Sequence, residues 1–81
     1  MPSVLRSGPY RFYFFRHENN EPAHIHVDRD ALSAKFWLNP ISLAPNIGFN
    51  DRELLKIRDI VVQHKEEFLR AWHEHFADHR R

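Results

Sequence analysis

The chain has 81 residues, no cysteine and a formal net charge of +1, from twelve Lys and Arg against eleven Asp and Glu. A chain of this length forms one domain, here residues 1–81, because it buries only about 60% of its unfolded surface and cannot divide that core. The absence of cysteine excludes disulfides and thiolate metal ligands, and the balanced charge argues against a dedicated duplex-DNA binder.

No segment is apolar enough for export or membrane insertion. The N-terminus, residues 1–6, lacks the apolar run of a signal peptide. No other stretch approaches the roughly 20 apolar residues that span a bilayer. We therefore expect a cytoplasmic protein that does not engage membranes.

Three strands are expected in the first half of the chain. Residues 10–17 are dense in aromatic side chains and follow a Gly-Pro turn, a pattern typical of a strand. The polar residues at 19–22 and 29–30 favour turns between extended segments. The predicted strands are 10–17, 23–28 and 32–38, and 41–44 is a candidate fourth strand of the same antiparallel meander.

The rest of the chain predicts one amphipathic helix over residues 51–77. Asn50 is a favourable N-cap, with Glu53 at the capping-box position three residues later. Phe49 and Leu54 have the spacing of a hydrophobic staple. Apolar side chains then recur every three or four positions, which indicates a helix with one buried face.

This helix is too long for the sheet that it covers. At 1.5 Å per residue it reaches roughly 40 Å, whereas a seven-residue strand spans roughly 23 Å. Its C-terminal half must therefore overhang the sheet, kink near His64 or pack on something else. The predicted fold class is α+β: an antiparallel three- to four-stranded β-meander packed on one long C-terminal α-helix.

Alternation along the strands assigns side chains to the two faces of the sheet. Ile25 and Val27 share one face of the second strand, while His24, His26 and Asp28 share the other. The apolar face packs on the helix. One helix covers one face only, so we expect the histidine-bearing face to be exposed and to act as an interaction site.

The candidate binding face draws on all three predicted strands and the first turn. A hairpin that pairs His17 with His24 also places Phe15 opposite His26. In the third strand, Lys35 shares this face. The residues assigned to the candidate binding face are Tyr13, Phe15, His17, Glu21, His24, His26, Lys35 and Trp37.

Several segments together resemble a known family. They are Gly8-Pro9-Tyr10 before the aromatic strand, EPAHIHV at 21–27, AKFWL at 34–38 and GFN before the helix. The chain resembles the small prokaryotic family catalogued as domain of unknown function 4160, from about Gly8 to Phe76. Ala23 departs from the pattern, since a second proline is common there.

The resemblance implies a context rather than a chemistry. The family has no established activity, so no catalytic residue is carried over from it. Its members are commonly encoded beside another small protein, an arrangement that suggests a toxin–antitoxin-like pair. The implied partner is that neighbouring small protein, and nucleic acid remains a conceivable target although the charge does not indicate it.

Three chemistries are open to the histidines. In the first, His24 and His26 act as general acid and base of a metal-independent ribonuclease, with Lys35 or Arg11 stabilising charge. In the second, His24 and His26 bind a divalent metal, and His17 or Asp28 completes three protein ligands. In the third, the histidines are hydrogen-bonding groups of a partner-binding face.

The third chemistry is our first choice, which makes the chain a binding and regulatory module rather than an enzyme. It engages its partner through the His24/His26 face of the sheet or through the overhanging C-terminal helix. No cofactor is expected. Glu21 is a candidate to hydrogen-bond a histidine and fix its tautomer. The apolar residues near the end of the helix predict a homodimer contact, made by Phe68, Leu69, Trp72 and Phe76.

Overall fold

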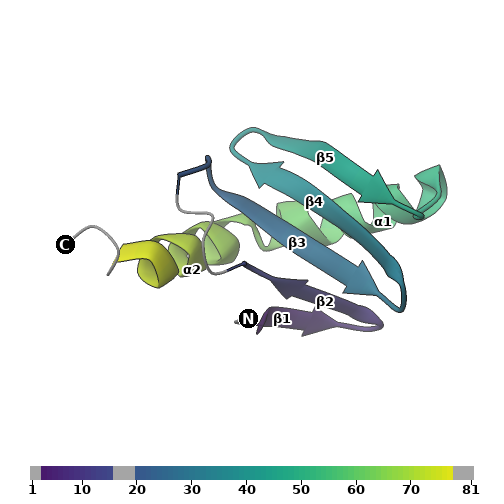
Figure 1. Ribbon diagram of the computed structural model, residues 1–81, viewed down its shortest axis with the longest axis horizontal. Helices are drawn as coiled ribbons and strands as arrows, with labels where there is room; N and C mark the ends of the chain where they lie inside the picture. Colours follow the sequence, from purple (N-terminus) through teal and green to yellow (C-terminus); the bar gives the residue numbers. More distant parts are fainter. Residues whose placement is uncertain (1–2, 16–19, 78–81) are drawn as a thin grey trace.

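The computed structural model of the chain describes residues 3–15 and 20–77. It is an α+β domain in which five strands precede two helices (Figure 1). The strands are β1 (Ser3–Ser7), β2 (Tyr10–Tyr13), β3 (His24–Arg29), β4 (Leu32–Leu38) and β5 (Ile41–Ile47). The helices are α1 (Asp51–Gln63) and α2 (Lys65–Ala77). Within these ranges, neither helix has the length and apolar character needed to cross a membrane.

The five strands form one antiparallel meander in the order β1-β2-β3-β4-β5. The predicted class and the meander are confirmed, but the predicted three to four strands are too few. The sequence reading missed β1, because Ser3–Ser7 has no aromatic residue and alternates weakly. The fourth strand runs to Ile47 instead of Ala44, because a bulge opposite Ala34 and Phe36 lets the chain continue past Pro45.

The first hairpin is shorter than predicted and has a different register. β2 ends at Tyr13, and Tyr13 rather than Phe15 lies opposite His26. The register is therefore displaced by two residues, which leaves each side chain on its predicted face because the side-chain period of a strand is two. His17, which was expected opposite His24, lies outside the described residues.

The predicted single helix is interrupted at His64, one of the three solutions that its length allowed. The His64 N–H still donates to the Ile60 carbonyl at 3.0 Å, and the Phe68 N–H donates to the His64 carbonyl at 2.8 Å. Nδ1 of His64 lies 3.0 Å from a Glu67 carboxylate oxygen. The ladder of hydrogen bonds thus passes through a local kink, and α2 takes a direction of its own.

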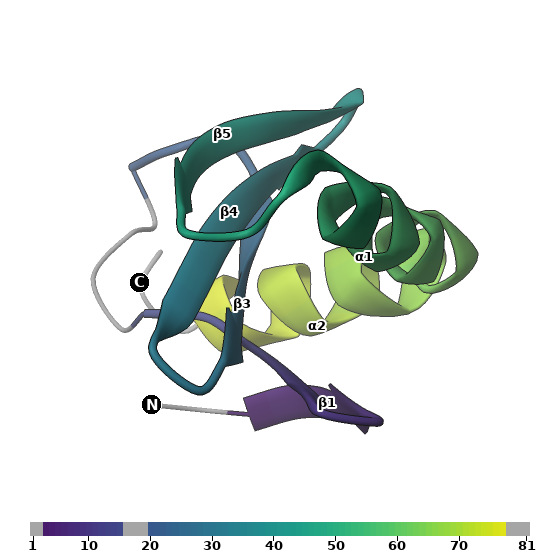
Figure 2. The same cartoon turned by 90° about the vertical axis from the view of Figure 1, so that its right-hand side faces the viewer.

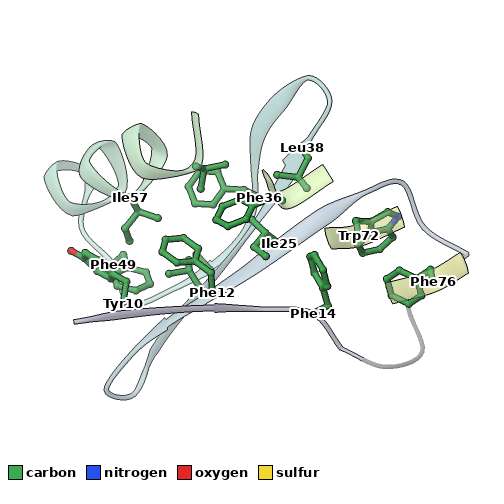
Figure 3. Packing of buried hydrophobic residues seen from close by; sticks show 14 residues of the cluster. Tyr10, Phe12, Phe14, Ile25, Phe36, Leu38, Phe49, Ile57, Trp72 and Phe76 are labelled. Carbon is green, nitrogen blue, oxygen red and sulfur yellow. The ribbon is translucent and has the colours of Figure 1, made fainter. Parts of the chain in front are cut away.

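Both helices lie on the same side of the sheet (Figure 2). The side chains predicted to face them are buried, including Ile25 and Val27 of β3 and Phe36 of β4. The core continues along α2, where Phe12 packs on Phe68 with ring centroids 5.4 Å apart. Beyond the end of β2, Phe14 packs edge-on against Trp72, with Phe76 beside it (Figure 3).

A polar cluster fixes the start of α1 to β3. The side chain of Asn50 accepts a hydrogen bond from the Glu53 N–H at 2.8 Å, which confirms the predicted N-cap. The Glu53 side chain does not close the predicted capping box. It accepts hydrogen bonds from Arg29 Nη2 and from the Tyr10 hydroxyl, both at 2.8 Å.

These contacts shift the acidities of the cluster. Hydrogen bonding from Arg29 lowers the pKa of Glu53. Burial, with the Glu53 hydrogen bond in second place, raises the pKa of Tyr10. The helix therefore begins at a charged anchor on the sheet, which sets where the rest of α1 crosses it.

Two glycines with positive φ offer a matched test of the turn that delivers the chain to α1. Gly48 has φ +99° and a Cβ built there lies 2.3 Å from Leu32 Cδ2, whereas Gly8 has φ +58° and open space around it. We expect Gly8→Ala to cost about 1 kcal/mol, and Gly48→Ala about twice that, because φ +99° lies outside the left-handed region that an L residue can adopt, while the end of the Leu32 side chain can rotate away. Urea unfolding of both variants measures the difference, and equal losses would contradict the greater backbone strain at residue 48.

Candidate functional site

The sheet surface that faces away from α1 and α2 is the candidate site, and we call it the outer face. Its centre is a row across three strands, in which Tyr13 of β2 pairs with His26 of β3 and His26 pairs with Lys35 of β4. A shallow hollow of about 270 Å³ lies over this row. The hollow is lined by Tyr13, Phe15, His26, Ser33, Ala34, Lys35, Pro45 and Ile47.

His24 does not lie open on this face, so the prediction that it is exposed is wrong. Its exposed fraction is 0%. His24 is the first residue of β3, at the end of the sheet where α2 passes, and its ring lies 4.7 Å from the Trp72 ring. Its Nδ1 is 2.9 Å from the carbonyl oxygen of Pro22. Because that oxygen can only accept, Nδ1 carries a proton and donates it.

His26 is nearly covered by its aromatic neighbours, with 8% of it exposed. Its ring stacks on Tyr13 at a centroid distance of 5.3 Å and meets Phe15 edge-on at 4.4 Å. The His24 ring is perpendicular to it at 5.1 Å. The two histidines are neighbours, as alternation predicted, but they belong to a packed aromatic cluster and do not flank an open space.

Tyr13 has contacts at its ring and at its hydroxyl. The Arg11 guanidinium lies 4.5 Å above one ring face, and His26 stacks against the ring. The hydroxyl donates to Asp28 Oδ1 at 3.0 Å. Burial, and after it the hydrogen bond to Asp28, raises the pKa of Tyr13 to about 12. Only 4% of Tyr13 is exposed, so the expectation of an exposed ring is wrong.

The charged residues of the outer face pair with one another. Lys35 Nζ donates to Glu21 at 2.7 Å and lies 4.3 Å from the centre of the Trp37 ring. Glu21 is 3.6 Å from Nδ1 of His24, farther than the Pro22 carbonyl. The backbone carbonyl, rather than Glu21, therefore makes the shorter contact that fixes the His24 tautomer.

The proposed metal ligands do not form a cluster in the described part of the chain. Asp28 already accepts from Tyr13 and lies 3.7 Å from Arg11. His17 lies outside the described residues. Among residues 3–15 and 20–77, no group of three or more His, Cys, Asp or Glu side chains is placed to hold a metal ion.

The helix residues assigned to a homodimer contact are used inside the chain itself. Phe68, Trp72 and Phe76 are 0%, 6% and 4% exposed, and Leu69 is partly buried against the same core. The physical reason is the kink at His64, after which α2 packs on the strand ends. These side chains do not offer the free apolar surface from which that dimer was predicted.

The residues that sequence reasoning missed come mainly from β5. Ile47 is 67% exposed and Pro45 stands beside it at the rim of the hollow. Both lie beyond the predicted end of the fourth strand. The bulge lies between Leu43 and Asn46 and includes Pro45. It shifts the alternation by one residue, so the strand pattern of residues 41–44 cannot be extended to find Pro45 and Ile47. The exposed apolar side chains at the edge of the hollow are therefore Ile47 and Phe15, which is 38% exposed.

Fold and face together define a small α+β domain whose five-stranded antiparallel sheet is covered by helices on one side only. The chain belongs to the family described as Domain of unknown function (DUF4160), which matches residues 10–73. No curated protein and no solved structure matches the chain. The matched segment begins with β2 and contains His24 and His26, so these are part of the family's domain.

Titration of Tyr13 tests the geometry of the outer face. We expect its ionisation near pH 12 by ultraviolet difference spectroscopy, and Tyr13→Phe should remove that step. Because tyrosine in the unfolded chain ionises near pH 10.0, stability from this group is complete below pH 10 and is lost as the pH rises towards 12. Asp28→Asn should lower the pKa of Tyr13, and an unchanged value would contradict the hydrogen bond.

Replacement of His24 tests whether its ring is a packed interior group. We expect His24→Ala to lower the free energy of unfolding by roughly 2–4 kcal/mol, because it leaves a cavity beside Trp72 and removes the hydrogen bond to Pro22. His73→Ala, at an exposed position of α2, is the matched control and should stay within about 0.5 kcal/mol of the unchanged protein. Urea unfolding measures both, and a similar small loss in each would contradict the packing.

Proposed function

We propose that the chain is a partner-binding module, one half of a toxin–antitoxin-like pair, and that it binds the neighbouring small protein through the outer face. The observation that carries the proposal is the apolar hollow on the side of the sheet without helices, with Phe15 and Ile47 exposed at its edge. A protein partner can fill such a hollow with apolar side chains, and the contact removes both apolar surfaces from water.

The pairing of charges on the outer face favours a protein over a nucleic acid. Arg11 faces Asp28, and Lys35 bonds to Glu21, so these cations are compensated within the chain. The whole chain carries a net charge of only +1. A phosphate backbone gains its affinity from uncompensated Lys and Arg, which the described residues of this face do not present.

The aromatic rings of the outer face are also poorly placed to stack on bases. Proteins that bind single strands present free ring faces to the bases. The Tyr13 ring contacts both Arg11 and His26 and is only 4% exposed, and the Trp37 ring has Lys35 over it. Partner side chains can instead contact the ring edges, Phe15 and the aliphatic rim.

Burial of His24 weighs against the ribonuclease alternative. A general acid or base must come within hydrogen-bond reach of the proton that it transfers. His24 is fully covered by its neighbours, so the pair of histidines reaches a phosphodiester only if α2 moves away. The same burial supports a role for His24 as an interior group that stiffens the end of the binding face.

A charge placed on the exposed rim tests the proposed partner. We expect Ile47→Glu to weaken binding of the neighbouring small protein by at least about tenfold, because the carboxylate must lose its water in an apolar contact. Isothermal titration with the purified partner measures the affinity. Thermal unfolding should stay nearly unchanged, since Ile47 is 67% exposed.

Leu55→Glu is the matched control. Leu55 is 65% exposed but belongs to α1, on the other side of the sheet, so its variant should bind the partner as the unchanged chain does. Equal weakening by both variants, or no binding of the neighbouring protein by the unchanged chain, contradicts the proposal.

A further inference from the structure

A second apolar surface lies on the helix side of the sheet, between its edge strand and α1. β5 is the last strand of the sheet, and α1 leaves it partly uncovered. A groove of about 380 Å³ opens there. It is lined by Phe36, Leu43, Asp51, Leu54, Leu55 and Arg58.

The exposed side chains of this groove are large and apolar. Leu43 pairs with Phe36 across the β4–β5 ladder and so points to the helix side, yet 44% of it is exposed. Leu55 stands on the α1 rim with 65% exposed, and Val62 continues the same helix with 46% exposed. Leucines this exposed around a groove beside a sheet edge indicate a surface that is covered in an assembly.

The charges of the groove identify what covers it. Asp51 and Arg58 are both exposed and lie seven residues apart on α1, roughly 10 Å along the helix. Within the described part of the chain, neither forms an ion pair with the other or with a third residue. An acidic partner meets repulsion from Asp51, and a basic partner meets repulsion from Arg58.

A second copy of the chain satisfies both charges at once. About a two-fold axis, the same patch meets itself, so a residue on one protomer contacts a different residue on the other and the reverse contact follows by symmetry. With α1 helices antiparallel across the axis, Asp51 of each protomer approaches Arg58 of the other. We propose that the chain is a homodimer through this groove, with the exposed Leu55 of each protomer covered by the groove of its partner.

This dimer is separate from the outer face. The groove belongs to the helix side and the hollow to the opposite side, so each protomer keeps its outer face available for a partner. Ile47→Glu should therefore leave the dimer intact, while Leu55→Glu should break it. Leu55→Glu therefore tests the dimer, and Ile47→Glu tests the proposed partner binding, so the failure of one can be told from the failure of the other.

Charge reversal provides the decisive experiment. We expect sedimentation equilibrium of the full chain, up to roughly 100 µM, to give a dimer. Arg58→Glu and Asp51→Lys should each raise the dimer dissociation constant by at least about tenfold, because each leaves like charges facing across the axis. An equimolar mixture of the two variants should recover the association, since one then carries two anions and the other two cations.

Arg70→Glu is the control for the change in net charge, because Arg70 is exposed on α2, outside the groove. It should dimerise as the unchanged chain does. Circular dichroism melts check that every variant is folded. A monomer at all concentrations overturns the proposal. A dimer dissociation constant that neither Arg58→Glu nor Asp51→Lys changes overturns it as well. Two folded variants whose mixture fails to associate overturn the antiparallel pairing.

Discussion

The packing of α2 on the strand ends is the constraint on which the rest of this structure depends. Phe12 meets Phe68 and Phe14 meets Trp72, at ring centroid distances of 5.4 and 5.3 Å. Each buried aromatic side chain contributes roughly 1.5–3 kcal/mol of transfer free energy, a large share of what so small a domain can gain. These contacts require the helix to bend at His64, and they commit both helices to one side of the sheet.

The same packing determines which polar side chains are buried and which stay at the surface. Since α2 passes the end of β3, the first side chain of that strand is enclosed, and His24 can be accommodated there because the Pro22 carbonyl accepts its Nδ1 proton. Neither α1 nor α2 covers the rest of the outer face. Arg11 pairs with Asp28 and Lys35 with Glu21, which leaves neutralised charges around an apolar centre.

Local patterns in the sequence predicted which face of the sheet each side chain occupies, but not how deeply the side chain is buried. Alternation placed Ile25 inward and His26 outward correctly, because the side-chain period of two survives a register shift of two residues. The same rule says nothing about how much an outward ring is covered, which depends on neighbours such as Phe15 that follow the end of the strand. Alternation could not predict the burial of His24 either, because the helix direction after His64 is set by tertiary packing.

The capping signal at Asn50 was read correctly for a similar reason, since a cap needs only the residues next to it. The role of Glu53 was not read correctly, because its partners Arg29 and Tyr10 come from strands far away in the sequence.

Contacts within the chain also limit how the outer face can select a partner. Charges that find partners within the chain cannot select a foreign one, so shape at the edge of the hollow, where Phe15 and Ile47 stand, must do the selecting.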